Sequence, residues 1–466
     1  MKVTVKNLGI LKEAEFDVGD LTIICGANNT GKTYATYALY GFLSFFNEAF
    51  IPRLLKKEDA ERLLNNGSIK IAIDDANELI NNACDEYSRN LSLVFAAHDK
   101  YFENAAFRVS LSETDMNFAG IEKTIQFAGL NRKPILNLIK RRGEHFITIN
   151  IIAQAEEIDM IDNDWIVQLI NRRIRDTLFG NVLPAPFIAS IERTGAALFQ
   201  RELDFSRNRL LEHVSNRDKD IDPHSLINAY YDKRYALPVK DDVDFNRSLL
   251  DVVKFEGIVA KNNPDILAAL DLILGGEYKV AKEGLYYIPN KIKVKLTMGE
   301  SASSVRSLLN FGIYLRHIAG PGDILMIDEP ELNLHPMNQR RMARILAKLV
   351  NAGIKVFITT HSDYILKEFN TLIMLKNLLN SPDSTASRVM EKYQYQDNEL
   401  LDMSRIKVYI AKEKLIKIEG ASRRQKHNTL VPAQIDEYGI GISDFDDTIN
   451  EMNIIQDELF FGGNFI

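Results

Sequence analysis

The sequence predicts an α/β fold, a parallel sheet covered by helices, and two observations lead to this fold class. An apolar run at Leu21–Cys25 feeds a glycine-rich turn and then a helical stretch from Lys32 to about Phe46. From residue 300 to 376, helix and strand patterns alternate, as is typical of parallel strands joined by crossover helices. With 466 residues, the chain is long enough for two or three lobes around such a core.

The elements of the N-terminal half follow from local patterns. Alternating apolar residues predict strands over 1–7 and 14–18, and the run at 21–25 predicts a strand buried on both faces. Residues 54–100 have leucines at helix spacing. Short apolar runs then predict an antiparallel sheet, followed by a helix and a core strand, at 107–111, 124–127, 145–152, 164–177 and 186–191.

The C-terminal half begins with a mainly helical, polar block over 195–272, the best candidate for an inserted lobe. Strands return at 277–287 and 291–296. The alternating region then predicts helices and strands at 305–319, 324–327, 337–352, 355–359 and 363–369. Residues 381–387 have a linker composition, and the remainder predicts strands near 407–410 and 415–419 and a helix near 446–458.

Composition is that of an ordinary soluble globular protein, with 46% hydrophobic and 26% charged residues. The chain has two cysteines, no apolar run long enough to span a bilayer and no signal segment, so we expect a cytoplasmic protein without membrane contact. The net charge of −7 argues against general attraction to nucleic acid. Local basic clusters keep DNA open as a partner: Arg132–Lys133, Lys140–Arg142, Arg172–Arg175 and Arg423–Lys426.

A phosphate-binding loop follows the first buried strand. Its residues are Gly26, Ala27, Asn28, Asn29, Thr30, Gly31, Lys32 and Thr33. The two glycines allow a turn that points backbone N–H groups at phosphates, and the following helix adds its dipole. We expect this loop to bind ATP, with Lys32 at the β- and γ-phosphates and the Thr33 hydroxyl on Mg²⁺.

Two further strand ends supply the rest of the predicted site. The apolar run at 324–327 delivers Asp328, which we expect to hold the metal, and Glu329, which we expect to activate the attacking water. The alternative is an acidic pair that caps the next helix. His361 ends the next strand, and we expect it to contact the γ-phosphate rather than merely begin a helix beside Ser362.

Here the residues resemble a family. The segments Asp-Glu-Pro-Glu-Leu-Asn-Leu-His-Pro at 328–336 and Thr-Thr-His-Ser at 359–362 are similar to the ABC-type ATPase core of the SMC, RecF and OLD-like group. Within it, the chain is most like the compact ATPase components of bacterial anti-phage defence systems of the PARIS or Septu type. The resemblance covers about residues 1–45 and 290–376, and weakly 184–200. It implies an ABC-type core with an antiparallel subdomain, a helical insertion and a small α+β C-terminal piece.

The resemblance also implies a composite site, in which a second copy completes the nucleotide site of the first. The matching signature segment contains Ser303 and Ser304, which would bind the partner's γ-phosphate, and Asn333 and His335 would lie at the interface. Val305 stands where the transporter pattern has glycine, and an ordinary helix-capping serine is the alternative. Arg193 would approach nucleotide or the neighbouring chain, or pair with Glu192 or Glu202.

Five segments follow from these expectations. They are the N-terminal part of the core (1–53), a helical and antiparallel-strand subdomain (54–183), a core strand with a helical insertion (184–276), the C-terminal part of the core (277–380) and a small α+β region (381–466). OLD-like proteins often carry a Toprim nuclease. Glu419, Asp444 and Asp446 match its acidic pattern only superficially, because the segment is too short for that domain.

The leading functional hypothesis is a slow regulatory ATPase that at least dimerises, senses an invader and licenses a separate effector, a nuclease by expectation. The alternative is a RecF- or SMC-like DNA-binding ATPase of repair or chromosome maintenance, although no sustained heptad arm is present. A soluble transporter subunit fits poorly because the signature departs from the transporter pattern. Trigger, stoichiometry and turnover rate are not encoded in any motif.

Overall fold

The computed structural model describes most of the chain. The described residues are 1–73, 76–112, 121–127, 133–141, 143–152, 163–199, 235–292, 294–379, 385–416, 423–436, 439–441, 451–452 and 454–458. The acidic residues weighed for a Toprim site, Glu419, Asp444 and Asp446, lie outside them, as does Glu202. The chain forms two compact units, residues 1–4, 41–90 and 106–186 in the first and 5–40, 91–105 and 187–466 in the second.

The first unit contains an antiparallel sheet of order β4-β8-β7-β6, packed with helices. Its elements are α2 (Lys57–Asn66), β4 (Ser68–Ala72), α3 (Ala76–Arg89), β5 (Ala106–Ser110), β6 (Ile121–Phe127), β7 (Lys133–Lys140), β8 (Phe146–Ile151) and α6 (Asn163–Phe179). The strands predicted at 124–127 and 145–152 are confirmed in this sheet as β6 and β8, whereas the strand predicted at 107–111 forms as β5 but is not part of this sheet. The helical prediction is wrong at β4, because Gly67 ends α2 in the left-handed conformation (φ 72°) and Ile69 and Ile71 then alternate toward β8.

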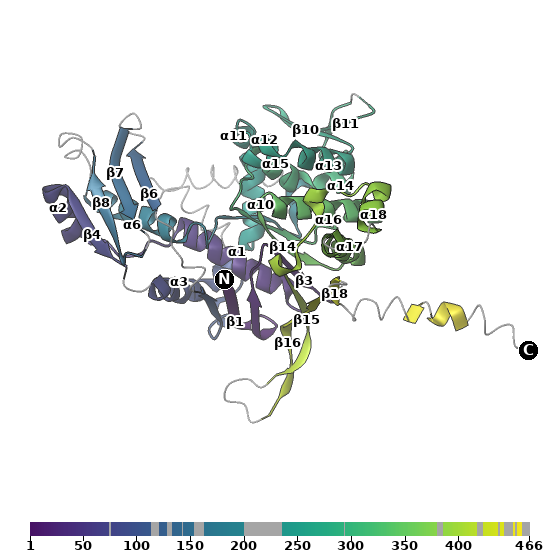
Figure 1. Cartoon of the computed structure of the whole chain (residues 1–466), viewed down its shortest axis with the longest axis horizontal. Helices are drawn as coiled ribbons and strands as arrows, with labels where there is room; N and C mark the ends of the chain where they lie inside the picture. Colours follow the sequence, from purple (N-terminus) through teal and green to yellow (C-terminus); the bar gives the residue numbers. More distant parts are fainter. Residues whose placement is uncertain are drawn as a thin grey trace, which may run out of the picture. The chain divides into compact units, whose positions relative to one another are not determined.

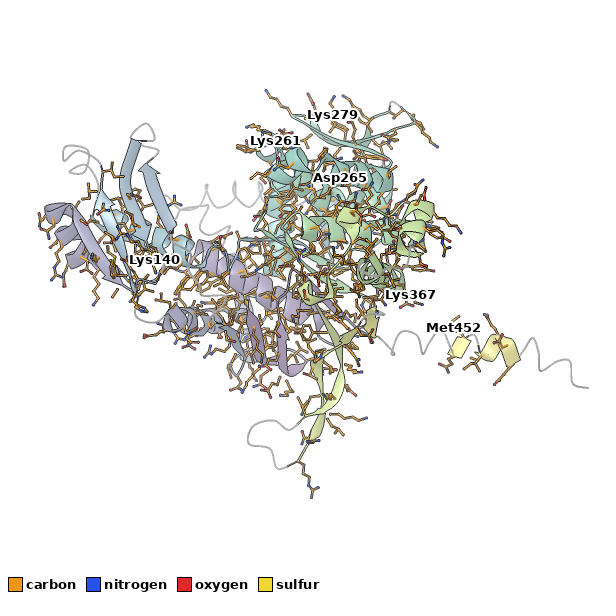
Figure 2. The ribbon with its side chains drawn as sticks, viewed as in Figure 1. Lys140, Lys261, Asp265, Lys279, Lys367 and Met452 are labelled. Atoms are coloured by element: carbon orange, nitrogen blue, oxygen red, sulfur yellow. The ribbon has the colours of Figure 1, made fainter. Side chains whose placement is uncertain are left out.

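One residue of a basic cluster noted in the sequence, Lys140, is not exposed to solvent. Lys140, labelled in Figure 2, is buried, and its Nζ donates a hydrogen bond to the carbonyl oxygen of Arg141 at 3.0 Å. Because its ammonium group is bound to the backbone, Lys140 is a structural residue. It does not offer a charge to a nucleic-acid phosphate.

The strands of the second unit lie in a large mixed sheet in the order β1-β2-β16-β15-β3-β14-β13-β9. Figure 1 labels β1, β16, β15, β3 and β14 among them. These strands are β1 (Lys2–Leu8), β2 (Leu11–Asp17), β3 (Leu21–Cys25), β9 (Pro186–Ala189), β13 (Ile324–Asp328), β14 (Lys355–Thr360), β15 (Ile406–Ile416) and β16 (Gln425–Pro432). At its centre β15, β3, β14 and β13 are parallel. Every residue of β3 and β13 is buried, as expected for strands covered on both faces, and the predicted α/β class is confirmed.

Helices and two small sheets complete this unit. The helices are α1 (Lys32–Glu48), whose first residues belong to this unit, α4 (Leu91–Val94), α7 (Arg193–Leu198), α10 (Leu237–Arg247), α11 (Leu249–Val252), α12 (Ile258–Asn262), α13 (Pro264–Leu274), α14 (Ser303–Ser307), α15 (Leu309–His317), α16 (Pro336–Asn351), α17 (Asp363–Leu379) and α18 (Thr385–Tyr393). The strands of the small sheets are β10 (Gly276–Ala281), β11 (Gly284–Pro289), β12 (Leu296–Thr297), β17 (Gln434–Asp436) and β18 (Gly439–Gly441). Short 3-10 turns lie at Asp99–Tyr101, Asp397–Glu399 and Met403–Arg405. No helix in the described part of the chain is both long and apolar enough to cross a bilayer.

The C-terminal region contributes directly to the main sheet. From the sequence we expect residues 381–466 to form a small region of their own. In the structure, β15 of this region lies beside β3, with Ile406 opposite Leu21 and Ile410 opposite Cys25. The two strands expected at 407–410 and 415–419 merge into the single strand β15, and α18 begins within the expected linker. The boundaries of the five predicted segments otherwise stay a prediction.

Candidate functional site

Three parallel strands bring the predicted site residues to one edge of the sheet. Asp328 at the end of β13 is in register with Thr359, and Thr360 at the end of β14 is in register with Cys25 at the end of β3. The residues after these strand ends are therefore neighbours in space, although 295 positions separate Thr33 from Asp328. The carboxyl edge of a parallel sheet is where α/β proteins bind ligands.

The conformation of the phosphate loop depends on its two glycines, Gly26 and Gly31. Gly26 has φ 138° and Gly31 has φ 101°, and a Cβ on Gly26 would lie 2.4 Å from the carbonyl oxygen of Ala411 in β15. Asn29, a residue type that tolerates the left-handed region, has φ 60°. The Thr30 hydroxyl closes the turn with a hydrogen bond to the Ala27 carbonyl at 2.8 Å. Residues 27–29 remain exposed, so the loop is accessible to a ligand.

Lys32 lies under this loop. Its Nζ donates hydrogen bonds to the carbonyl oxygens of Gly26 at 3.0 Å and Ala27 at 2.8 Å. Burial lowers the pKa of Lys32, and the nearby carboxyl groups of Glu329 and Asp328 act in the opposite direction. The ammonium group thus lies between the loop backbone and the acidic pair, where it can meet a phosphate charge.

Asp328 and Thr33 meet across the site. The Thr33 hydroxyl lies 3.4 Å from Asp328 Oδ2, and the Thr359 hydroxyl donates to the other carboxylate oxygen, Oδ1. Burial raises the pKa of Asp328, whereas the hydrogen bond from Thr359 lowers it. A hydroxyl and a carboxylate oxygen side by side are the ligand types that Mg²⁺ takes together with nucleotide phosphates, so these residues fit the ion.

Glu329 has a strained backbone and a paired side chain. Its φ of 52° lies in the left-handed region, and its N–H donates to the carbonyl oxygen of Thr359 at 3.2 Å. Its Oε1 lies 3.3 Å from His361 Nε2, and both side chains are partly exposed. The hydrogen bond from His361 lowers the pKa of Glu329, which keeps this carboxyl group ionised. Glu329 does not cap the next helix, which was the alternative, because His335 is the N-cap residue of α16.

Glu331 is a site residue for which no pattern in the sequence predicted a role. Its Oε1 accepts a hydrogen bond from the Thr360 hydroxyl at 2.9 Å and another from the backbone N–H of His361 at 2.7 Å. Burial raises the pKa of this carboxyl group. The position of the residue within the motif at 328–336 was the only available signal, and the bond explains how the loop after β13 positions His361.

Arg193 is a buried clamp within the unit. Its guanidinium donates to four carbonyl oxygens: Ser190 at 2.7 Å, Ser307 at 2.8 Å, Asp328 at 2.6 Å and Glu329 at 2.7 Å. The side chain is 3% exposed, so it contacts backbone rather than nucleotide or a neighbouring chain. Glu192, one predicted partner, accepts a hydrogen bond from the Tyr37 hydroxyl at 3.0 Å.

The predicted signature serines lie at the start of α14. Ala302 is the N-cap residue of this helix, so the alternative of an ordinary capping serine does not describe Ser303 or Ser304. Ser303 is exposed and Ser304 is partly exposed. The Ser307 hydroxyl donates to the Leu332 carbonyl at 3.0 Å, which joins this helix to the loop after Glu329. The role of the two serines stays a prediction.

The loop between Glu331 and α16 is held from its C-terminal side. Gln339 in α16 donates to the Leu334 carbonyl at 2.9 Å and accepts from the Ser362 hydroxyl at 2.5 Å. Within this loop Asn333 has φ 60°, and both Asn333 and His335 are exposed. They are therefore accessible to another molecule, as the interface prediction requires.

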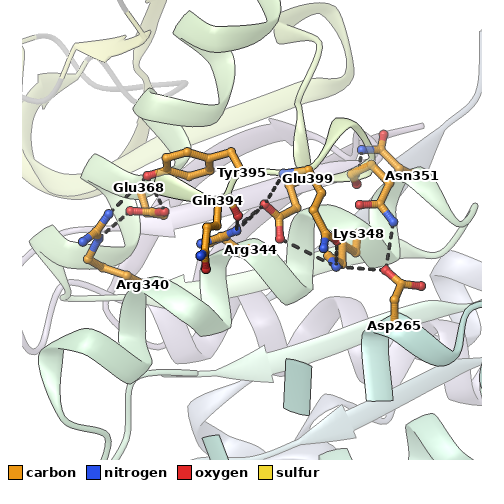
Figure 3. A network of polar contacts seen from close by, with 11 residues as sticks. Asp265, Arg340, Arg344, Lys348, Asn351, Glu368, Gln394, Tyr395 and Glu399 are labelled. Carbon is orange, nitrogen blue, oxygen red and sulfur yellow. Dashed lines mark hydrogen bonds and ion pairs between the residues drawn. The ribbon is translucent and has the colours of Figure 1, made fainter. Parts of the chain in front are cut away.

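Ion pairs along one face fix α16 in place (Figure 3). Arg340 pairs with Glu368 of α17 at 2.6 Å, Arg344 with Glu399 at 2.8 Å, and Lys348 with Asp265 of α13 at 2.9 Å. The carboxyl groups of Glu368 and Glu399 are almost fully buried, so these pairs specify how the helix docks. Because α16 follows the loop after Glu329, this docking sets the position of that loop.

A parallel sheet with a phosphate loop after one strand and an acidic pair after a strand two places away defines a P-loop ATPase. The chain belongs to the AAA ATPase domain family, whose model matches residues 1–366. No protein of curated function matches it.

Three SMC head structures are similar at low identity. The SMC head domain from Thermotoga maritima is 12% identical over 93% of this chain and 98% of that chain, with a TM-score of 0.28. An SmcHead bound to the C-winged helix domain of ScpA is 14% identical over 79% and 91%, with a TM-score of 0.28. An Smc head with an extended coiled coil, bound to the C-terminal domain of ScpA derived from Pyrococcus furiosus, is 13% identical over 98% of both chains, with a TM-score of 0.29. Similarity this low says nothing about activity or partners.

Proposed function

We propose that this chain is a slow regulatory ATPase whose nucleotide site is completed by a second copy. The observation that carries the proposal is the convergence of Lys32, Asp328 and Glu329 at one sheet edge, with Lys32 beneath an exposed phosphate loop. The exposed positions of Ser303, Asn333 and His335 support the shared site, because another copy can reach them.

Each residue has a role in the proposed hydrolysis of ATP. The loop N–H groups and the Lys32 ammonium group hold the β- and γ-phosphates and stabilise the negative charge of the transition state. Glu329 orients the attacking water and accepts its proton. His361 donates to the γ-phosphate and holds Glu329 in position. Thr33 and Asp328 would hold Mg²⁺, which supplies positive charge beside the phosphates when it is bound.

The biological role that we propose is the sensor or scaffold component of an anti-phage defence system that controls a separate effector protein, a nuclease. Support for it is the resemblance of the segments at 328–336 and 359–362 to defence ATPases. Expression of the chain with its neighbouring genes should lower phage plating, and Lys32→Ala should restore it. Equal plating with Lys32→Ala and wild type would contradict the role.

Solution mass tests the shared site. Glu329→Gln should bind ATP–Mg²⁺ but hydrolyse it poorly, so ATP should raise its mass or tighten an existing oligomer. Lys32→Ala, which should not bind nucleotide, is the control and its mass should not change with ATP.

Bulky residues at 303 and 304 should block hydrolysis while the monomer still binds ATP. If Glu329→Gln bound ATP and stayed monomeric, the assignment of the phosphate loop would still hold, but the proposal of a shared site would be wrong. ATP-dependent DNA binding by the isolated chain would instead favour the RecF-like alternative.

A further inference from the structure

A two-stranded ribbon extends beyond the main sheet (Figure 1). β15 pairs with β3 only over Ile406–Ile410, and β16 pairs with β2 only where Asn428 meets Leu11. Beyond these points β15 and β16 pair with each other, up to Ile416 opposite Gln425. We call residues 411–416 of β15 and 425–428 of β16, together with the adjoining residues 423 and 424, the ribbon. The six residues of β15 in the ribbon, at about 3.3 Å each, give it a length of roughly 20 Å.

The ribbon is strongly basic although the whole chain carries a net charge of −7. It contains one acidic residue, Glu413, and five basic ones: Lys412, Lys414, Arg423, Arg424 and Lys426. The last four of these are exposed. Within the described part of the chain, no ion pair neutralises those four, whereas many other surface cations of the unit are paired. Their charge therefore faces solvent.

The basic residues lie on both faces of the ribbon. Lys414 is opposite His427, and the next pair, Leu415 opposite Lys426, points to the other face because successive strand residues alternate. A protein-binding surface would instead need one face with large apolar or aromatic anchors. Residues 411–428 include no Phe, Tyr or Trp, so the ribbon also lacks the stacking groups that hold single-stranded bases.

We propose that the ribbon binds double-stranded DNA through its phosphates, without sequence preference. A two-stranded ribbon has the width that the major groove admits, and cations on both faces can meet the phosphates that border the groove. This inference goes beyond the proposed function, since it requires neither ATP hydrolysis nor a second copy of the chain.

The test compares two full-length variants with the same change in charge. The ribbon variant carries Lys414→Glu, Arg423→Glu, Arg424→Glu and Lys426→Glu. The control carries the same reversal at four exposed cations elsewhere, outside the basic clusters of the sequence, namely Lys100, Lys261, Lys279 (both in Figure 2) and Lys282. Fluorescence anisotropy with a labelled 25-base-pair duplex of arbitrary sequence measures Kd over a series of salt concentrations, and circular dichroism checks that both variants fold.

We expect wild type and control to bind the duplex, and the ribbon variant to bind it at least tenfold more weakly at low salt. Four phosphate contacts predict a slope of log K against log salt of about −3.6, which the ribbon variant should lose. Lys32→Ala should bind as wild type does, so failure of the proposed ATPase role would leave this result unchanged. Equal Kd values for ribbon variant and control, or no duplex binding by wild type, would overturn the proposal. So would displacement of the duplex by polyglutamate at equal charge, which would indicate an acidic protein partner.

Discussion

The backbone N–H of His361 donates a hydrogen bond to Glu331 Oε1 at 2.7 Å. This bond joins the loop after β14 to the loop after β13, and the same carboxylate oxygen accepts from Thr360 at 2.9 Å. One buried carboxyl group thus fixes His361 relative to Glu329. Because His361 in turn lies 3.3 Å from Glu329, the geometry proposed for hydrolysis depends on Glu331.

Glu331→Ala should lower the rate of ATP hydrolysis by about 10- to 100-fold, because a hydrogen bond to a charged group is worth roughly 1.5–3 kcal/mol. ATP affinity should change little, since Glu331 does not contact the phosphate loop. Glu331→Gln keeps an acceptor oxygen and should recover part of the rate. Steady-state kinetics measure both. A loss confined to ATP affinity, with kcat unchanged, would contradict this positioning role.

Gly26→Ala should weaken ATP binding by more than tenfold and lower the thermal midpoint. The added Cβ would lie 2.4 Å from the Ala411 carbonyl oxygen, so the loop or β15 must shift. Gly67→Ala is a matched control, because Gly67 also has a positive φ but has open space around it, and only strain of about 1 kcal/mol is expected there. Calorimetric titration and thermal unfolding measure the two effects. Similar behaviour of the two variants would mean that strain, rather than the contact with β15, governs Gly26.

Arg193→Ala should destabilise the protein by about 3–5 kcal/mol, because it leaves buried carbonyl groups without donors. Arg193→Lys should also be clearly destabilised. A lysine ammonium group lacks the planar, forked guanidinium that lets arginine donate to four carbonyl oxygens at once. Urea unfolding measures the free-energy change. If Arg193→Ala lost activity but kept its full stability, Arg193 would be a nucleotide contact instead of a clamp.

Asp242 should make stability depend on pH. Burial raises the pKa of Asp242 to about 6, although it accepts hydrogen bonds from the Ser190 N–H at 2.9 Å and Asn310 at 2.7 Å. An unfolded aspartate ionises near pH 3.9, so between about pH 4 and 6 the unfolded chain releases a proton that the folded chain retains. The free energy of unfolding should therefore fall as pH rises through this window, by at most roughly 3 kcal/mol.

Asp242→Asn should remove that fall, because an amide has no proton to release in this range. Asparagine can still accept from Ser190 and donate to the side-chain oxygen of Asn310, which has no partner among the described residues. Urea unfolding between pH 4 and 7 gives the difference between variant and wild type. A difference that stays constant across this range would show that Asp242 does not titrate there.

The sequence predicted those parts of the site that local patterns define. The strand, loop and helix around Lys32, and the strand ends at Asp328 and His361, each have a signal within about ten residues. The bonds that Arg193 makes had no such signal, because three of its partners are backbone carbonyls on two distant segments, at Ser307 and at Asp328–Glu329. The place of β15 was equally hidden: the strand itself was predicted, but a strand's neighbour is decided by contacts across the whole fold.

The order of strands in the sheet has a consequence for how the chain is made. β3 lies between β14 and β15, and the Cys25 thiol donates to the carbonyl of Tyr409, 384 residues later. A ribosome therefore releases the phosphate loop long before either neighbour of its strand has been synthesised. Until β14 and β15 have been made, the backbone groups along both edges of the apolar strand β3 have no strand to pair with. We therefore expect the growing chain to depend on chaperones. We also expect it to acquire nucleotide affinity only once β15 has left the ribosome.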